Sequence, residues 1–312
     1  MTIDIHCHLW KRGFIPEAYL KAIGKALSEW RTQTGNPITL DEMAEKVFPQ
    51  WWDPDGEHTI RQMDEAGIEK TLLLPIDLGF PPMSEPPISI EEQNKHILGL
   101  VKKHPDRLIG FCGVDPRRKN ALELFERSVE EWGARGLKFV PFTGFYPDGE
   151  EAYSLVEKAA EWNLPLVTHV GPEFPPFYPK YSEPSRLVRI LTDFPDLQVI
   201  APHLGMARWR ELIEVSKLSQ NLTCDVSGLQ LGAAASFSRF CHMLRRAIDG
   251  FGMHRVMFGT DDPPFTPFVS KKQWVETIKD LPHNAPEGVS FTQEEVDALL
   301  HSNAERVLAT IP

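Results

Sequence analysis

The sequence has few cysteines and no long apolar segment, and these absences exclude several classes of protein. Its four cysteines are scattered without a Cys-x-x-Cys pair, so a disulfide framework is not expected. No apolar run approaches the roughly 20 residues that a membrane-spanning helix needs. The first residues have neither the charged nor the apolar region of a secretory signal. We therefore expect a cytoplasmic protein with reduced thiols.

A basic surface is also missing. The 312 residues include 44 acidic and 33 basic side chains, which gives a formal net charge of −11 at pH 7. Nucleic-acid-binding proteins need a basic stripe that neutralises phosphates, so neither a nucleic acid nor a membrane is an expected partner. The 42% of hydrophobic residues can form one large core. The partners that we expect are a small-molecule substrate and, at most, a second copy of the chain in a homodimer.

Short apolar runs alternate with amphipathic segments along the whole chain. The eight runs have four to seven residues each and are often β-branched, which is typical of buried parallel strands. They are Thr2–Ile5, Lys70–Ile76, Leu108–Val114, Gly136–Val140, Pro165–Val170, Gln198–Pro202, Leu222–Val226 and Arg255–Gly259. Predicted helices, most of which end near a Gly or Pro, are Thr59–Ala66, Ala121–Trp132, Glu150–Trp162, Ser185–Phe194, Trp209–Ser219, Phe237–Asp249 and Thr292–Ala309.

Eight strands separated by helices predict an α/β fold, a (β/α)₈ TIM barrel formed by residues 1–312 as a single domain. An open doubly wound sheet is less favoured, because no Gly-x-Gly-x-x-Gly follows an early strand. About 65 residues separate the first two runs, and we predict that residues 11–56 form an inserted helical cap. Adjacent tryptophans are unfavourable to expose. At least one of Trp51 and Trp52 should therefore be covered by the barrel mouth or by a partner subunit.

Four histidines and one aspartate are placed where strands end. Side chains alternate along a strand, so His6 and His8 point to the same face. His169 and His203 end the fifth and sixth runs, and Asp261 follows the eighth. The carboxyl ends of barrel strands form the rim where such enzymes place their chemistry, and these side chains suit Zn²⁺ and other divalent ions. The alternative is that the histidines only bind backbone carbonyls.

Seven short motifs occur in order along nearly the whole chain. They are Ile3-Asp-Ile-His-Cys-His-Leu, Met63-Asp-Glu-Ala-Gly-Ile, Gly136-Leu-Lys-Phe, Leu164-Pro-Leu-Val-Thr-His-Val-Gly, Pro202-His-Leu-Gly, Phe258-Gly-Thr-Asp and Asn303-Ala-Glu-Arg-Val. As a set, they resemble the amidohydrolase superfamily. The branch that they resemble contains aminocarboxymuconate semialdehyde decarboxylase, aromatic-acid decarboxylases and TIM-barrel metal-dependent hydrolases.

The resemblance implies a site built on one divalent ion. Its ligands would be His6, His8, His169 and Asp261, and the ion would be zinc, with Mn²⁺ or Fe²⁺ as alternatives. His203 would be a base or an electrophilic residue beside the ion's water. Lys138 ends the fourth strand, where two-metal members carry a carboxylated lysine that bridges the ions. A contact to an anionic substrate is the interpretation that we favour for this lysine, and a structural ion pair is a further alternative.

Two departures from the family pattern bear on the reaction. Decarboxylases of the hydroxybenzoate type begin with Glu-x-His, where this chain has His6-Cys-His8. The semialdehyde decarboxylases have Gly-Gly-Gly after the sixth-strand histidine, where this chain has Leu204-Gly205-Met206. Both departures favour a hydrolase over a decarboxylase.

The main prediction is therefore a metal-dependent hydrolase. A bound divalent ion lowers the pKa of its water towards ~7, and His203 and Asp261 can accept the proton. The substrate would be a small carboxylated cyclic or unsaturated lactone, ester, amide or compound with an activated C–C bond. The alternatives are a non-oxidative decarboxylase or hydratase of an aromatic or muconic acid, and a catalytically silent ligand-binding barrel. Residues that could contact a flat carboxylated substrate are Lys138, Arg12, Trp52 and Phe174.

Overall fold

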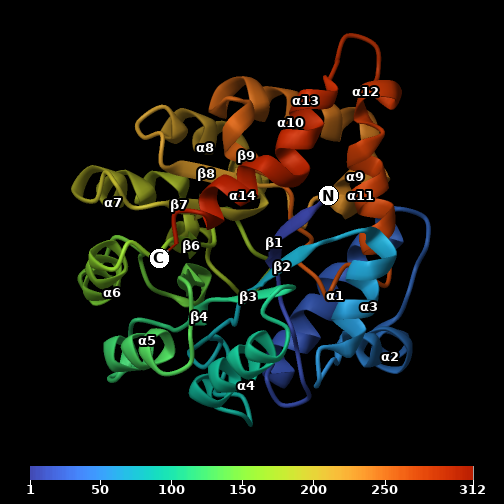
Figure 1. Ribbon diagram of the computed structural model, residues 1–312. Coiled ribbons are helices and arrows are strands. Elements are labelled where there is room, and N and C mark those ends of the chain that lie inside the picture. Colours follow the sequence, from blue (N-terminus) through green and yellow to red (C-terminus); the bar gives the residue numbers. More distant parts are fainter. Residues whose placement is uncertain (312) are drawn as a thin grey trace.

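The computed structural model describes residues 1–311, in which parallel strands form a barrel surrounded by helices (Figure 1). Each strand is hydrogen-bonded to its neighbours in chain order within two sheets. The strands are β1 (Ile3–Cys7), β2 (Lys70–Leu73), β3 (Leu108–Gly110), β4 (Cys112–Gly113), β5 (Leu137–Phe139), β6 (Leu166–Thr168), β7 (Val199–Ala201), β8 (Leu222–Asp225) and β9 (Val256–Met257).

These segments correspond to the eight predicted strands. Strands β3 and β4 are two parts of one predicted strand, separated by Phe111, whose backbone N–H donates to the carbonyl of Leu73 (3.1 Å). The barrel closes between its first and last strands, where the N–H of Ile5 donates to the carbonyl of Phe258 (3.0 Å). The predicted α/β barrel is therefore confirmed.

Helices surround the barrel and connect its strands. They are α3 (Glu57–Ala66), α4 (Ile90–Lys103), α5 (Ala121–Glu130), α6 (Glu150–Glu161), α7 (Leu187–Asp193), α8 (Trp209–Ser216), α9 (Gln230–Ala235), α10 (Phe237–Phe251), α11 (Lys271–Lys279), α12 (Leu281–Asn284), α13 (Gln293–Asp297) and α14 (Asn303–Leu308). Shorter 3-10 or π-helical turns are Pro141–Thr143, Pro179–Ser182, Pro184–Arg186, Pro202–Arg208, Met253–Arg255 and Ala298–Ser302. Thr292 precedes α13 and forms a capping box, in which its side chain accepts from the N–H of Glu295.

The core has two parts. Alternate strand residues, such as Ile5, Leu72 and Met257, form a cluster that also includes Ala304 and Val307 of α14. A larger cluster lies between the strands and the surrounding helices. Within residues 1–311, no helix combines the length and apolar character that crossing a membrane would require.

The segment between β1 and α3 is largely helical. It contains α1 (Glu17–Gln33) and α2 (Leu40–Glu42), followed by the short turns Met43–Val47 and Phe48–Trp51, and Figure 1 shows α1 and α2 beside α3. Trp51 is only 1% exposed, and its ring packs against Trp10, with 5.7 Å between ring centroids. Trp52 is half-buried. The prediction that one of the adjacent tryptophans is covered is therefore confirmed for Trp51, by residues of its own chain.

Candidate metal centre

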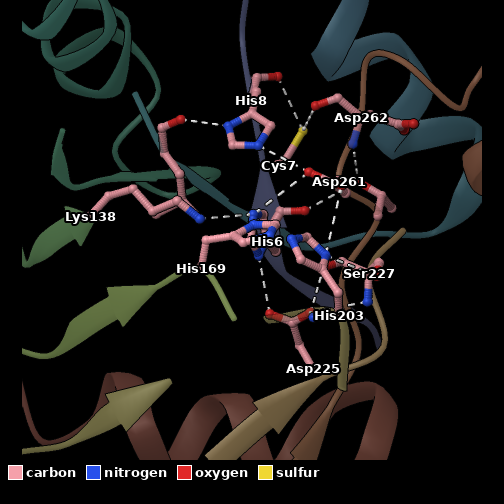
Figure 2. Close-up of polar contacts among 12 residues, drawn as sticks. His6, Cys7, His8, Lys138, His169, His203, Asp225, Ser227, Asp261 and Asp262 are labelled. Carbon is pink, nitrogen blue, oxygen red and sulfur yellow. Dashed lines mark hydrogen bonds and ion pairs between the residues drawn. The ribbon is translucent and has the colours of Figure 1, made fainter. Parts of the chain in front are cut away.

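The site is organised around His6 of β1 and Asp225 at the end of β8. His6 is fully buried, and its Nδ1 lies 3.1 Å from Oδ2 of Asp225 (Figure 2). The other oxygen of Asp225 accepts the backbone N–H groups of His203 and Ser227, each at 3.0 Å. A carboxylate on one ring nitrogen fixes the orientation of a histidine and leaves the other nitrogen for a metal ion. Asp225 therefore orients His6 and also fixes the backbone of His203.

The chain adopts strained conformations at two of the candidate residues. His203 and Asp261 have φ angles of 58° and 56°, in the left-handed region that non-glycine residues seldom adopt. The N–H of Asp261 donates to the carbonyl of His6 (2.7 Å), which holds the loop after β9 against β1. Gly228 also has a positive φ, and a Cβ there would lie 3.2 Å from Oδ2 of Asp261. The backbone is thus shaped to bring these groups together.

All five predicted residues meet in one place. The candidate ligand atoms of His6, His203 and Asp261 lie within 4.8 Å of one another. His8 is adjacent, because its Nε2 lies 3.0 Å from Oδ1 of Asp261 (Figure 2). The ring of His169 lies 4.9 Å from that of His203, and its buried Nε2 has no hydrogen-bond partner in the described part of the chain. This group thus includes His203, which was predicted to lie beside the ion and not to bind it. The ligand roles of His8 and His169 remain predictions.

The protonation states at this site suit a cation. Burial, reinforced by neighbouring cationic groups, lowers the pKa of His6 and of His169, so both rings are neutral and have a free lone pair. Burial alone would raise the pKa of Asp261, but the nearby His203 and the hydrogen bond with His8 hold it below its ordinary value. Neutral imidazoles with an ionised carboxylate are a suitable donor set for a divalent ion. The residues present therefore fit the metal that the sequence predicts.

Lys138 of β5 lies inside this cluster. It is only 2% exposed, and its Nζ lies 3.3 Å from Nε2 of His6 (Figure 2). Burial lowers its pKa to about 8. Among residues 1–311, no carboxylate oxygen lies within ion-pair distance of this ammonium group. The structural ion pair considered from the sequence is therefore not observed, and the lysine is available to a ligand.

A small cavity opens beside the cluster. Its lining combines polar groups with an apolar wall, and the residues are His6, His8, Tyr19, Ile76, Lys138, Val140, Phe142, His169, Glu173, His203 and Asp261. Of the predicted substrate contacts, only Lys138 is among them. Phe174 packs behind Tyr19, with 5.5 Å between ring centroids, and Arg12 lies over the ring of Trp52 at 5.7 Å. Substrate contacts by these three residues remain predictions.

Three residues of this site were not predicted from the sequence. Asp225 was detectable, because it is an acidic residue within the apolar run Leu222–Val226. Glu173 follows His169 by four residues in a loop, and only its closeness to that histidine hinted at a role. Tyr19 comes from α1, and nothing in its local sequence distinguishes it from a packing residue.

A second buried polar cluster is formed by residues that neighbour the candidate ligands in the sequence. Lys271 at the start of α11 is 2% exposed, and its Nζ lies 3.2 Å from Sγ of Cys7 and 3.2 Å from Asp262. Asp4 lies 3.7 Å from the same ammonium group and accepts from the hydroxyl of Thr260 (2.7 Å). Lys271 therefore links β1, which carries His6 and is followed by His8, to the loop after β9, which carries Asp261. Burial raises the pKa of the Cys7 thiol to about 12, so this cysteine stays protonated.

A curated relative and a solved structure are similar to this chain over most of its length. A curated relative, the uncharacterized protein y4mH of Sinorhizobium fredii, is 25% identical over 285 residues, covering 81% of this chain and 91% of the relative. An uncharacterized TIM-barrel protein from Bordetella bronchiseptica superposes with a TM-score of 0.70 and 21% identity over 99% of this chain and 98% of that one.

Two further solved structures have a similar fold. A 5-carboxyvanillate decarboxylase from Novosphingobium aromaticivorans, in complex with manganese and a nitrobenzoic acid, gives a TM-score of 0.68 and 18% identity over 99% of this chain and 96% of that one. A probable 2-pyrone-4,6-dicarboxylic acid hydrolase from Acinetobacter baumannii gives a TM-score of 0.60 and 15% identity over 99% of both chains. The Amidohydro_2 family model, described as amidohydrolase, matches residues 3–310, and this chain belongs to that family.

Proposed function

We propose that this protein is a metal-dependent decarboxylase that releases carbon dioxide from a small aromatic acid without an oxidant. The observation that carries the proposal is the buried ammonium group of Lys138 beside the metal cluster, without a carboxylate within ion-pair distance in residues 1–311. A buried charge without a partner is unfavourable, and an anionic ligand would supply the missing counter-charge. The carboxylate of an acid is such a ligand.

The apolar wall of the cavity supports the same reaction. Ile76, Val140 and Phe142 line the side that a ring would contact, and Phe142 packs its edge against His169 with 4.8 Å between centroids. Such a wall would exclude water from the ring carbon at which the reaction takes place. The C–C bond breaks, its electron pair stays on the ring carbon, and a proton replaces the carboxyl group. We assign the proton transfer to His203.

A divalent ion would be held by His6, His8, His169 and Asp261 and would attract the negatively charged oxygens of the substrate as a Lewis acid. The manganese in the solved 5-carboxyvanillate decarboxylase supports Mn²⁺ as a second choice beside the predicted Zn²⁺. Asp225 would hold His6 in place, and Lys138 would pair with the substrate's carboxylate.

Hydrolysis, the main prediction from the sequence, becomes the second candidate. It is favoured by the His6-Cys-His8 pair and by the similarity to the probable 2-pyrone-4,6-dicarboxylic acid hydrolase. In that reaction, water adds to the carbonyl carbon of a lactone and His203 accepts the proton of the water; the ring C–O bond then breaks, and the proton passes from His203 to the released ring oxygen. Decarboxylation is preferred because several similar structures are aromatic-acid decarboxylases, including those for 2,6-dihydroxybenzoate and 5-carboxyvanillate.

The two reactions differ in what the solvent contributes. Manganese-loaded or zinc-loaded protein is incubated in ¹⁸O-water with 2,6-dihydroxybenzoate, 5-carboxyvanillate or 2-pyrone-4,6-dicarboxylate. We expect carbon dioxide release, a solvent hydrogen on the ring carbon, and no ¹⁸O in the ring product. Lys138→Met should lower kcat/KM by about 100-fold, whereas the exposed control Lys272→Met should not. Incorporation of ¹⁸O without carbon dioxide would establish hydrolysis, and no turnover of any acid would refute the proposal.

A further inference from the structure

The hydroxyl of Ser227 lies between the carboxylate of Asp225 and the ring of His203. Ser227 follows β8 closely and is fully buried. Its hydroxyl is hydrogen-bonded to Oδ1 of Asp225 and lies 2.9 Å from Nδ1 of His203 (Figure 2). The same carboxylate oxygen accepts the backbone N–H groups of His203 and Ser227, each at 3.0 Å. A carboxylate has no hydrogen to donate, so the Ser227 hydroxyl is the donor in its bond with Asp225.

This bond determines which nitrogen of His203 carries hydrogen. A serine hydroxyl has one hydrogen, and because that hydrogen points to Asp225, the oxygen can only accept from His203. The backbone carbonyl of Ser227, which is always an acceptor, lies 3.1 Å from the same Nδ1. Oδ2 of Asp261 adds a negative charge 3.7 Å from this nitrogen. All three neighbours require a hydrogen on Nδ1, so in the neutral ring the free lone pair is on Nε2.

The turn after β8 also encloses Nδ1. Gly228 has a φ of +72°, and a Cβ built there would lie only 3.3 Å from Nδ1 of His203. The backbone of Ser227 and Gly228 therefore covers this edge of the ring, while His203 as a whole lines the cavity beside the candidate ligands. With Nδ1 enclosed and bonded to the protein, Nε2 is the ring nitrogen left for a molecule in the cavity.

Asp225 thus orients two histidines through different oxygens. Oδ2 lies 3.1 Å from Nδ1 of His6, whereas Oδ1 acts on the ring of His203 through the Ser227 hydroxyl. A change at Asp225 disturbs both rings. A change at Ser227 removes only the bond to the ring of His203, so it separates the proton-transferring group from the metal centre.

We propose that Ser227 is a positioning residue that holds His203 in the tautomer with hydrogen on Nδ1 and leaves Nε2 as the reactive nitrogen. The inference rests on the proposed function in one respect, because it takes His203 as the group that transfers the proton. Nε2 takes up a proton from solvent and gives it to the ring carbon that keeps the electron pair of the broken C–C bond, and the imidazole returns to its neutral form. The hydrogen on Nδ1 stays in its bonds to Ser227 throughout.

The tautomer can be measured without turnover. Zinc-loaded protein labelled with ¹⁵N-histidine is studied by long-range ¹H–¹⁵N NMR, and the variant His203→Asn identifies the signals of His203. We expect hydrogen on Nδ1 and none on Nε2 in the wild type. Ser227→Ala removes one acceptor at Nδ1, so a fraction with hydrogen on Nε2 should appear. Hydrogen on Nε2 in the wild type would overturn the inference, and so would a change in the Nε2 signal that shows zinc bound to it.

Kinetics test whether the tautomer matters for the reaction. With an acid from which the wild type releases carbon dioxide, Ser227→Ala should lower kcat by about tenfold or more, while KM and the affinity for Mn²⁺ stay within about twofold. Ser227→Cys, which fills nearly the same volume with a weak acceptor, should behave in the same way and serves if the alanine variant does not fold. The control Ser238→Ala, at an exposed position of α10, should leave all three quantities unchanged.

The outcomes distinguish the positioning role from the reaction. An unchanged tautomer in both Ser227 variants, or an altered tautomer with an unchanged kcat, overturns the positioning role and leaves the reaction standing. A loss of Mn²⁺ affinity whose effect on kcat disappears at excess metal would make Ser227 a support of the metal centre and would also overturn it. The expected tautomers without carbon dioxide release from any acid would support the assignment of the two nitrogens and overturn the proposed reaction.

Discussion

Replacing Asp225 by Asn tests how the metal centre is held in place. One oxygen of Asp225 lies 3.1 Å from Nδ1 of His6, and the other accepts from the backbone N–H of His203 and of Ser227 and from the Ser227 hydroxyl. An amide has one oxygen and one NH₂ group. In either orientation, the NH₂ group therefore faces at least one donor. No rotamer of the asparagine restores all the bonds.

The expected loss follows from these contacts. Removing the group that orients a metal-binding histidine typically lowers metal affinity by about 10- to 100-fold. The unpaired buried donor should also destabilise the fold by about 1–3 kcal/mol. Chelator competition measures the affinity for Mn²⁺ or Zn²⁺, and urea unfolding of the metal-free protein measures stability. Asp297→Asn, at an exposed position of α13, is the matched control. Metal affinity within twofold of the wild type would refute the role assigned to Asp225.

Three further perturbations follow from the same geometry. Gly228→Ala should lower the free energy of unfolding by about 1–2 kcal/mol and weaken metal binding, because φ is positive there and the new Cβ would lie 3.2 Å from Asp261. A change in melting temperature of less than about 1 °C with normal affinity for the metal would contradict this. Lys271→Met should lower the free energy of unfolding in urea by about 3–5 kcal/mol, since it leaves buried Asp262 without its cation. The exposed control Lys272→Met should have a free energy of unfolding within about 0.5 kcal/mol of the wild type. Removing the metal with dipicolinate should abolish turnover and lower the melting temperature. Adding back Mn²⁺ at about 100 times its Kd should raise the free energy of unfolding by roughly 2.7 kcal/mol. An unchanged melting temperature would argue against a specific site.

The barrel could be predicted from the sequence because its strands are buried on both faces. Runs such as Leu222–Val226 are short, apolar and bounded by helix-ending residues, so their number and order are visible without knowledge of tertiary contacts. The break between β3 and β4 at Phe111 was not predictable, because it depends on hydrogen bonding between strands. Helix α4 was also missed, although Ser89 and Glu92 form a capping box at its start.

The metal centre was predictable in part for a similar reason. His6, His8, His169, His203 and Asp261 lie at strand ends, and barrel topology alone brings strand ends to one rim. The cavity wall was not predictable, because Tyr19 reaches the site from a helix whose packing no local pattern specifies. The choice between Lys138 as an ion-pair partner and as a ligand contact depended on which carboxylates lie nearby, and this is decided by tertiary structure.

His203→Asn distinguishes the two roles that its position allows. Its Nδ1 lies 2.9 Å from the hydroxyl of Ser227, and its ring belongs to the tightest group of candidate ligand atoms, with His6 and Asp261. If His203 transfers a proton, His6, His8, His169 and Asp261 still hold the ion in the variant. Metal content should then stay near normal while turnover falls by about 100-fold or more. A variant that loses its metal and regains activity when excess metal is added would make His203 a ligand. Near-normal turnover would remove it from the mechanism, and the proton would have to come from solvent or from another residue of the cavity.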